Sequence, residues 1–250
     1  MQVKIPHWLV SLTLLITLIL GGCASQQATS VSEINASKTT ITSAPATVAQ
    51  SRQESKLPRL EGKATVVMLV KGSPITIEVD GTNAPITAGN FVDLVQRGVY
   101  DGLMFHRVVR EPSPFVVQGG DPRSKDTSIP AEELGTGSFI DPATNRPRYI
   151  PLEIKPKGAK EPIYSKTFDA AGVKTEPELP HRRGAVAMAR SSSPDSASSQ
   201  FYFALTDLSF LDGNYAVFGY VTEGMDVIDK IEQGDRIESA KVTQGAENLK

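Results

Sequence analysis

The stretch YDGLMFHRVVREPSPFVVQGGD, Tyr100–Asp121, decides the fold of this chain. Two runs within it, FHRVV and FVVQ, are aromatic or β-branched, and the polar, proline-rich link REPSP separates them, so two neighbouring strands are predicted. Arg107 and Gln118 are unexpected in these runs, because charged and amide side chains are seldom buried without a partner. Their purpose depends on the strand faces that they occupy.

Similar apolar runs predict six further strands and a mainly β fold. The 20 glycines and 17 prolines also favour many turns over a helical bundle. We expect a closed eight-stranded antiparallel β-barrel, because short strands joined by turns can bury one face in this way. The six further runs are 64–70, 75–79, 182–190, 199–205, 215–221 and 237–245.

Two α-helices are expected to cap this barrel. Residues 84–98 have Pro85 near the start, where its missing N–H does no harm, and Gly98 at the end, where a left-handed cap suits glycine. Residues 225–234, MDVIDKIEQG, are amphipathic. The residues expected to face the core are Phe91, Leu94 and Val95 in the first helix, and Met225, Val227, Ile228 and Ile231 in the second.

The segment 122–180 interrupts this pattern. It is polar, contains many prolines and shows few signs of regular structure. We predict a long surface loop or insertion, with a short strand at YIPLEI, residues 149–154.

Residues 1–22 have the features of a signal peptide. Trp8–Leu20 carries no charge and is shorter than the roughly 20 residues that span a membrane. The following LGGCAS resembles the lipobox of bacterial lipoproteins, so we expect cleavage before Cys23 and its modification by lipid, including palmitate. An uncleaved anchor, or an ordinary signal peptide with a chance cysteine, is the alternative.

Residues 23–60 are rich in Ser, Thr, Ala and Gln and have almost no large apolar side chains. Such a segment cannot bury enough surface to offset its ordering entropy, so it is predicted to be a flexible tether. The tether would hold a folded domain, residues 61–250, on the periplasmic side of a bacterial membrane.

Composition argues against several other functions. The formal net charge is −2, and there is no basic stripe of the kind that binds nucleic acid. One cysteine cannot form an internal disulfide, and no Cys/His cluster has metal-ligand spacing. We therefore expect no metal, cofactor or nucleic-acid partner. His106, alone in an apolar run, is interpreted as a satisfied structural histidine rather than a catalyst.

Alternation predicts how the polar side chains are displayed, because neighbours in a strand point to opposite faces. Arg107 should share a face with Phe105, and Gln200 with Tyr202. Gln118 should share a face with Val116. If these faces adjoin, Arg107, Gln118 and Gln200 form a polar cluster beside aromatic surface. Three unrelated exposed polar side chains are the alternative.

The motifs FHRVV, QGGD, AMAR, SQFYFAL and LDGNYAVFG resemble the cyclophilin family of peptidyl-prolyl cis-trans isomerases, and PITAGNF in the first helix agrees. They follow the family's order from about residue 64 to residue 242, which covers the folded domain but not the tether. The resemblance implies an eight-stranded barrel with two capping helices and a groove on its outer face. With Cys23, it implies a bacterial lipoprotein form of the family.

The resemblance also implies the site residues. Arg107 and Gln118 take the catalytic positions. The substrate-binding positions are Phe115, Val116, Ala189, Arg190, Gln200, Tyr202, Leu211 and Tyr215.

Several site residues depart from the family's best-known eukaryotic pattern. Arg190 stands where asparagine is usual, Tyr215 replaces a histidine, and Phe210 stands where a tryptophan is common. That tryptophan contacts cyclosporin, so weak sensitivity to the drug is expected. Val116 and Tyr202 replace methionine and phenylalanine, which changes the shape and polarity of the pocket. The REPSP link and the segment 122–180 are also longer than usual.

The activity implied by the resemblance is rotation about X-Pro bonds, which would assist the folding of exported proteins. The expected partners are proline-containing polypeptides and, through Cys23, the membrane, and the protein is expected to be a monomer. The alternative is a catalytically weak, cyclophilin-like binding module that recognises proline-containing segments or a partner protein.

Overall fold

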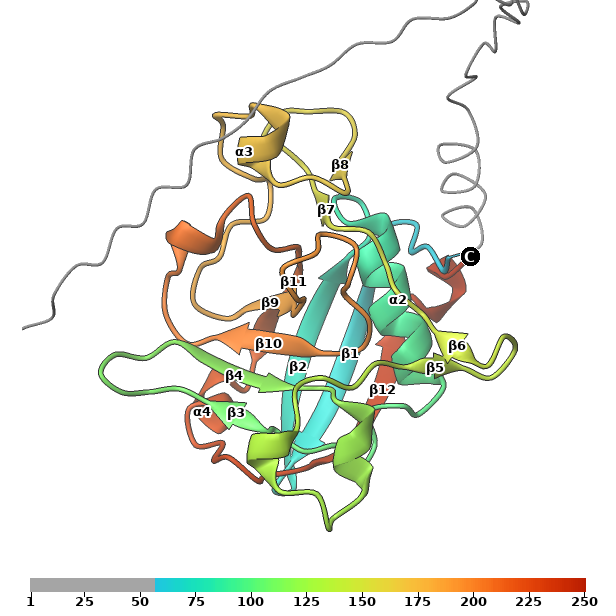
Figure 1. Cartoon of the computed structure of the whole chain (residues 1–250), viewed down its shortest axis with the longest axis vertical. Coiled ribbons are helices and arrows are strands. Elements are labelled where there is room, and N and C mark those ends of the chain that lie inside the picture. Colours follow the sequence, from blue (N-terminus) through green and yellow to red (C-terminus); the bar gives the residue numbers. More distant parts are fainter. Residues whose placement is uncertain (1–56) are drawn as a thin grey trace, which may run out of the picture. The chain divides into compact units, whose positions relative to one another are not determined.

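The computed structural model describes residues 57–250 (Figure 1). The predicted signal peptide, Cys23 and nearly all of the tether lie outside these residues, so those predictions are untested. No helix within the described residues is long and apolar enough to cross a membrane.

Two residues before the predicted domain boundary at residue 61 also pack against the core. Leu60 is fully buried in the core, and Leu57 packs against the same cluster, because both are apolar side chains next to the first strand. The main chains of Arg59 and Lys250 exchange two hydrogen bonds, of 2.9 and 2.8 Å. The two ends of the described chain therefore lie side by side.

One eight-stranded antiparallel sheet forms the framework and contains all eight predicted strands, in the order β12-β1-β2-β11-β9-β10-β4-β3. The prediction of a mainly β fold is confirmed. The strand bounds are β1 Lys63–Val70, β2 Ser73–Asp80, β3 Arg107–Val108, β4 Val116–Gly119, β9 Ala185–Met188, β10 Phe201–Ala204, β11 Val217–Glu223 and β12 Ile237–Gln244.

The strands form where period-two alternation lets one face enter the core. In β1, Ala64, Val66, Met68 and Val70 are buried, while the residues between them are partly exposed. Lys71 and Gly72 join β1 to β2, and both have positive φ, 50° and 70°, as the favoured two-residue hairpin turns require.

The sheet is curled, and within residues 57–250 its end strands β12 and β3 do not form a continuous ladder. Met104 and Arg236, just before these strands, form an isolated antiparallel bridge. The Phe105 N–H also donates to the Asp235 carbonyl at 2.8 Å. The expected closed barrel is therefore not shown; the structure shows a curled sheet whose ends are joined by loop segments.

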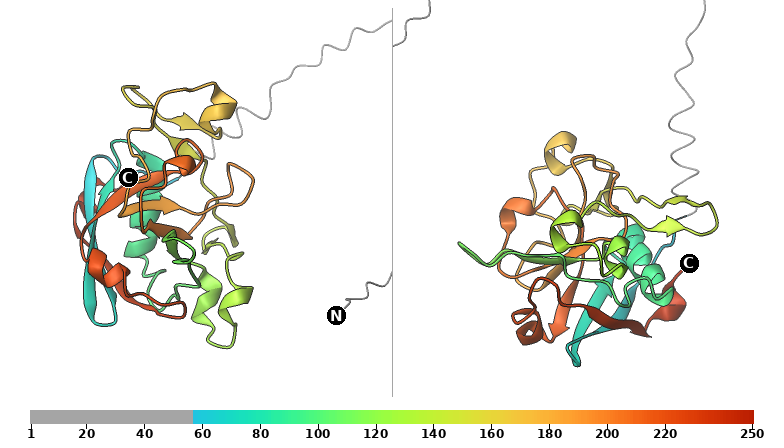
Figure 2. Two further views of the ribbon diagram at one scale, coloured as in Figure 1. Left: turned by 90° about the vertical axis from the view of Figure 1, so that its left-hand side faces the viewer. Right: turned by 60° about the horizontal axis from the view of Figure 1, so that its bottom comes forward.

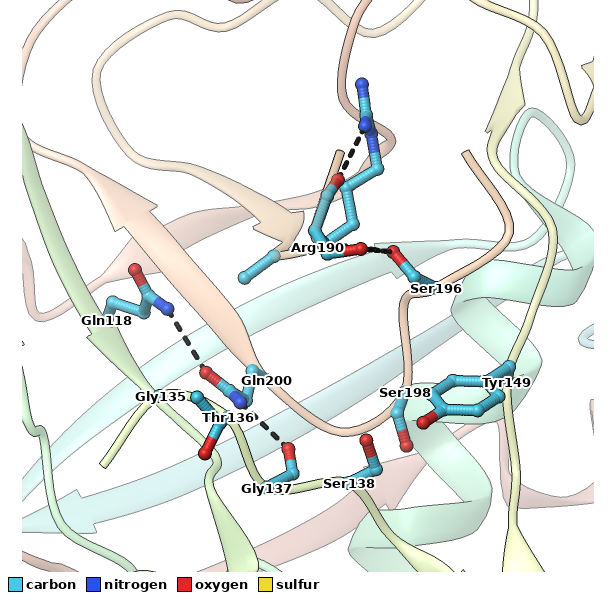
Figure 3. A pocket seen from close by; sticks show the side chains of 12 residues that line it. Gln118, Gly135, Thr136, Gly137, Ser138, Tyr149, Arg190, Ser196, Ser198 and Gln200 are labelled. Atoms are coloured by element: carbon cyan, nitrogen blue, oxygen red, sulfur yellow. Dashed lines mark hydrogen bonds between the residues drawn. The ribbon is translucent and has the colours of Figure 1, made fainter. Parts of the chain in front are cut away.

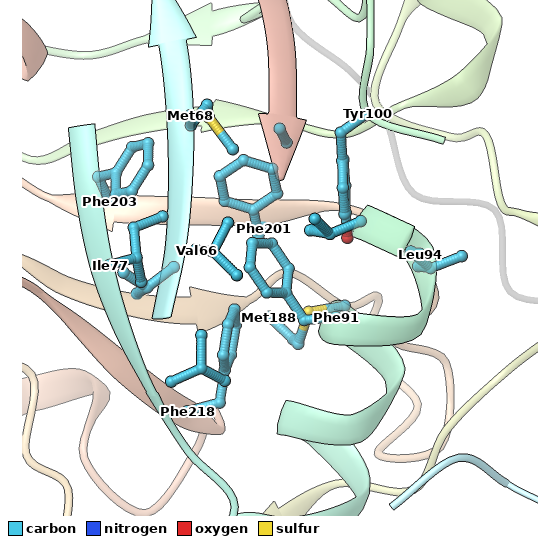
Figure 4. Packing of buried hydrophobic residues seen from close by; sticks show 14 of the residues in the cluster. Val66, Met68, Ile77, Phe91, Leu94, Tyr100, Met188, Phe201, Phe203 and Phe218 are labelled. Atoms are coloured by element: carbon cyan, nitrogen blue, oxygen red, sulfur yellow. The ribbon is translucent and has the colours of Figure 1, made fainter. Parts of the chain in front are cut away.

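Helix α2, Pro85–Gln96, packs on the inner face of the curled sheet. Its Phe91 ring contacts the rings of Tyr100, Phe201 and Phe218 at centroid distances of 5.1, 5.5 and 4.8 Å (Figure 4). Pro85 begins the helix, and Gly98, with φ of 64°, follows its C-cap, as predicted.

The second predicted helix is shorter than expected. The α-helical part of 225–234 is α4, Met225–Ile228, after which the chain makes only turns. Ile228 and Ile231 are nonetheless fully buried, and Met225 and Val227 pack against the core. The amphipathic pattern thus identified the buried face but overestimated the helix length.

The segment 122–180 is more structured than the predicted surface loop. It lies away from the β1–β2 hairpin (Figure 2), and Phe139 and Ile150 reach the main core. Leu152, Ile154 and Phe168 form a smaller buried cluster with Ala216. The prediction of a short strand within 149–154 is confirmed. The elements of the segment are β5 Ile140–Asp141, β6 Arg146–Pro147, β7 Glu153–Ile154, β8 Ile163–Tyr164, α3 Phe168–Ala171 and two 3-10 turns, Pro122–Lys125 and Ala131–Glu133.

Glu153 ties this segment to helix α2. Its carboxylate accepts hydrogen bonds from the main-chain N–H groups of Ile86 (3.1 Å) and Thr87 (2.7 Å). These are first-turn donors without a partner inside the helix, and the N-cap residue Ala84 offers no side-chain acceptor. Glu153 is fully buried, and burial raises its pKa above the usual value. A carboxylate from the insertion therefore caps the main helix.

A buried ion pair makes a second connection. Arg148 donates to Asp93 of α2 at 2.6 Å, and Arg97 donates to the same carboxylate at 2.8 Å. The Arg148 guanidinium also lies 4.8 Å from the centre of the Phe139 ring. The insertion is thus fastened to α2 by charged as well as apolar contacts.

Candidate active site

Arg107, Gln118 and Tyr202 form a row across three neighbouring strands. Arg107 of β3 pairs with Gln118 of β4, and Gln118 pairs with Tyr202 of β10. Directly paired residues project from the same face of a sheet. On the opposite face, Val117 and Phe203 enter the main core. The predicted alternation in β4 and β10 is confirmed.

The predicted alternation around Arg107 is wrong in one respect. Phe105 is fully buried in the main core, whereas Arg107 is exposed, so these two residues do not share a face. The reason is that β3 begins only at Arg107. Before it, the main chain of Phe105 bonds to residues 234 and 235, outside the strand ladder.

A chain of side-chain hydrogen bonds runs along one edge of the site. Arg107 Nη1 donates to Gln118 Oε1 at 3.3 Å, and Gln118 Nε2 donates to Gln200 Oε1 at 3.2 Å. Gln200 Nε2 in turn donates to the Gly137 carbonyl at 2.8 Å (Figure 3). The structure therefore brings the three predicted polar residues together, with a main-chain anchor from the insertion. This series of hydrogen bonds orients the guanidinium of Arg107, which carries five N–H donors.

A cavity of about 260 Å³ opens beside this row. It is lined by all the predicted site residues except Gln200, which lines a neighbouring cavity of about 290 Å³. The first cavity is called here the proline pocket, after the ring that the cyclophilin resemblance leads us to expect in it. Its residues are Arg107, Phe115, Val116, Gln118, Ala189, Arg190, Tyr202, Leu211 and Tyr215.

The walls of the proline pocket are apolar and aromatic. Val116 and Tyr202 are buried, with Phe115, Leu211 and Tyr215 packed against the same cluster. The Arg107 guanidinium lies 5.6 Å from the centre of the Phe115 ring. Such a pocket can hold a small apolar ring beside a fixed positive charge.

Arg190 is bound to its own surroundings. Its Nε and Nη2 atoms donate to the Asn214 carbonyl at 3.0 and 2.7 Å, and its guanidinium lies 4.7 Å from the centre of the Tyr215 ring. The side chain therefore stabilises the pocket wall at Tyr215.

His106 is not the satisfied histidine that was expected. It is buried, but neither ring nitrogen has a hydrogen-bond partner within residues 57–250. Burial lowers the pKa of its imidazole, which favours the neutral form beside Arg107. Asp121 and the Met104 main chain favour the charged form, but burial outweighs them.

Two contributions to the site come from residues outside the predicted set, although Phe210 was noted as a departure from the family pattern. Phe210 is 69% exposed and stacks on Phe115 at the rim, with ring centroids 6.1 Å apart. His181 and Asp212 stand behind Tyr202, in hydrogen bonds described below. Asp212 lies within the motif LDGNYAVFG, but only the fold shows that His181 is beside it.

The described part of the chain has no cluster of side chains suited to binding a metal ion. Residues 57–250 contain no group of three or more His, Cys, Asp or Glu side chains placed to hold a metal ion.

Comparison with known proteins identifies the class and then the family. A solved cyclophilin-type isomerase of Cryptosporidium parvum, determined in the presence of the dipeptide Ala-Pro, superposes with a TM-score of 0.52 at 22% identity, covering 72% of this chain and 99% of that one. The described domain thus has the cyclophilin fold. The family model "Cyclophilin type peptidyl-prolyl cis-trans isomerase/CLD" matches residues 65–247. The chain belongs to the cyclophilin-type peptidyl-prolyl cis-trans isomerase family.

Curated relatives agree with this assignment. A putative thylakoid lumen peptidyl-prolyl cis-trans isomerase of Synechocystis sp. is 47% identical over 204 residues, covering 77% of this chain and 50% of the relative. A probable peptidyl-prolyl cis-trans isomerase of Brucella abortus is 34% identical over 180 residues, covering 71% and 76%. The chain spans about half the length of the first of these relatives.

Proposed function

We propose that this protein is a peptidyl-prolyl cis-trans isomerase that acts on proline-containing segments of exported proteins. The observation that carries the proposal is the placement of Arg107, held by Gln118, at the edge of an apolar pocket of about 260 Å³. Membership of an isomerase family and the names of the relatives support it.

The chemistry requires neither a covalent step nor a proton transfer. Rotation about a peptide bond faces a barrier of about 18–20 kcal/mol, because the nitrogen lone pair is conjugated with the carbonyl. In the twisted amide that conjugation is lost, and the nitrogen becomes a hydrogen-bond acceptor. A donor aimed at it stabilises the transition state more than the ground state, which accelerates the reaction. We assign this role to Arg107, whose guanidinium remains charged.

The pocket walls would hold the proline while the preceding carbonyl turns. Val116, Tyr202 and Leu211 offer apolar surface for the pyrrolidine ring. We assign to Gln118 the orientation of Arg107, and to Gln200 the binding of substrate backbone, since it lies on the cavity that continues from the pocket. Holding the proline side of the X-Pro bond fixed uses binding energy to orient the substrate for rotation.

Turnover of a proline peptide by the full chain is the direct test. The wild type is expected to accelerate isomerisation, and Arg107→Ala is expected to lower turnover by about a hundredfold or more, since each 1.4 kcal/mol of lost stabilisation is tenfold in rate. Unfolding of both proteins is followed as the control. Peptide binding without acceleration by the wild type would instead support a cyclophilin-like binding module.

We further propose that the protein acts outside the cytoplasm, attached by lipid at Cys23. The signal-like Trp8–Leu20 and the lipobox-like LGGCAS support this attachment, and one relative is named as a thylakoid lumen protein. The full chain, expressed in a bacterium, is expected in the membrane fraction with a lipid mass on Cys23, whereas Cys23→Ser is expected in the soluble fraction. An unmodified Cys23 in the wild type would overturn the lipoprotein assignment.

A further inference from the structure

A buried hydrogen-bond chain stands behind one wall of the proline pocket. The Tyr202 hydroxyl lies 2.9 Å from His181 Nε2, and His181 Nδ1 lies 2.7 Å from Asp212 Oδ1. His181 is only 2% exposed and does not line the pocket, so the hydroxyl end of Tyr202 points away from the space that the substrate would enter. The ring of Tyr202, not its polar group, forms the wall.

The donors in this chain follow from the chemistry of its end. The same Asp212 oxygen also accepts the His181 main-chain N–H, at 2.8 Å, and an ionised carboxylate only accepts. His181 Nδ1 must therefore be a donor. In the neutral imidazole Nε2 is then the acceptor, and the Tyr202 hydroxyl donates to it. The buried hydroxyl thus finds its partner without turning into the pocket.

The orientation of Tyr202 is passed on to its neighbours in the pocket. Tyr215 meets Tyr202 edge to face, with ring centroids 6.2 Å apart and planes at 80°. The Arg190 guanidinium lies over the Tyr215 ring at 4.7 Å. A tilt of Tyr202 would therefore move a second aromatic wall, and would alter the width of the pocket on two sides.

We propose that His181 and Asp212 are positioning residues for prolyl isomerisation, which hold the ring of Tyr202 as a flat wall against the substrate proline. The inference rests on the proposed function. It assigns a role to a buried histidine and a half-buried carboxylate that do not line the pocket and that the rate mechanism at Arg107 does not use.

The test is a double-mutant cycle in the full-length protein, with proline-peptide turnover as the readout. His181→Leu removes the acceptor and leaves the Tyr202 hydroxyl buried without a partner, so kcat/KM is expected to fall about tenfold, equivalent to about 1.4 kcal/mol. Tyr202→Phe removes the need for an acceptor, and its kcat/KM, whatever its value, is the reference for the cycle. The double variant should then match Tyr202→Phe, because the phenyl ring has no hydroxyl to satisfy.

A merely structural role for His181 gives a different pattern. The tenfold loss would then persist in the Tyr202→Phe background, which would overturn the proposal, as would an unchanged kcat/KM in His181→Leu. Tyr100→Phe removes another buried tyrosine hydroxyl, which donates to the Ser199 carbonyl; Tyr100 lines neither cavity and is the matched control for a general loss of packing. It is expected to keep wild-type turnover.

His181→Gln keeps the experiment decisive if His181→Leu fails to fold. The glutamine carboxamide oxygen can accept the hydrogen bond from the Tyr202 hydroxyl, so near-wild-type kcat/KM is expected. If His181→Gln lowered kcat/KM by the same factor in the wild-type and Tyr202→Phe backgrounds, the inference would be contradicted. If the wild type shows no turnover, the proposed function fails. The same set of variants, with the Kd for the proline peptide as the readout, still tests whether His181 positions the ring of Tyr202. Coupling between positions 181 and 202 in Kd supports it, and additivity overturns it.

Discussion

The proline pocket and the insertion 122–180 use polar residues in opposite ways. In the pocket, Arg107 and Gln118 lie on the outer face of the sheet, and their hydrogen bond keeps a charged group at an open cavity. In the insertion, Glu153 and Arg148 are buried, and their partners are main-chain groups and a carboxylate of helix α2. The first arrangement leaves the charge available to a ligand, while the second uses the charge to hold two parts of the fold together. Changes in the two regions should therefore affect different measurements.

The largest effect is expected from Glu153→Ala. This change leaves the N–H groups of Ile86 and Thr87 buried without an acceptor, and unfolding free energy should fall by about 3 kcal/mol, since each lost partner costs about 1–3 kcal/mol. Denaturant unfolding measures the loss, while turnover per folded molecule should stay close to wild type. A large loss of turnover in the folded variant would contradict the separation of the two regions.

Arg107→Lys is the counterpart in the pocket. Lysine keeps the charge but loses the planar group that faces Phe115 and bonds Gln118, so kcat/KM should fall about a hundredfold, or about 2.7 kcal/mol. Unfolding free energy should change by less than about 0.5 kcal/mol, because the side chain is exposed. Equal turnover by lysine and arginine would show that charge alone is sufficient.

The pH dependence of stability distinguishes the regions further. Burial raises the pKa of Glu153 in the folded state above its usual value of 4.5, so the folded protein holds this proton more tightly than the unfolded chain does. The contribution of this group to stability is therefore fully present below pH 4.5 and is lost as the pH rises through the folded pKa. Unfolding curves of wild type and Glu153→Gln are measured from pH 4 to 8. The unfolding free energy of the wild type, relative to that of Glu153→Gln, should fall as the pH rises. A constant difference would indicate that Glu153 does not titrate in this range.

The smallest effect is expected at the rim. Phe210→Ala removes an exposed ring that stacks on Phe115, and KM for a proline peptide should rise about threefold with kcat unchanged, since an aromatic pair contributes about 0.5–1.5 kcal/mol. Phe210→Trp should keep the stack and serves as the control. An altered kcat would place Phe210 closer to the reacting bond than its exposure indicates.

The same comparison explains what could be predicted from the sequence. Gln118 and Tyr202 lie in strands, and Gln200 directly precedes β10. A period of two determines the face of each side chain there, so their grouping follows from the sequence once the strands are neighbours. The period failed at Phe105, because the strand starts two residues later than its apolar pattern suggests.

The contacts of the insertion could not be predicted in this way. Glu153 caps a helix that begins nearly 70 residues earlier in the chain, and no local pattern connects the two. His181 and Asp212 are 31 residues apart, and only the folded chain brings the imidazole between the carboxylate and Tyr202. Polar contacts between distant segments depend on the final packing, whereas alternation is a property of each strand alone.

The paired main chains of Arg59 and Lys250 have a consequence for how the domain can be handled. Because its two ends meet, a short linker could join them, and the chain could be opened at an exposed loop without changing the order of strands in space. Circular permutants could take their new termini in the exposed residues 111–113, just before pocket-lining Phe115, or 191–193, just after pocket-lining Arg190. The position of the chain termini in this domain can therefore be changed while the fold is kept.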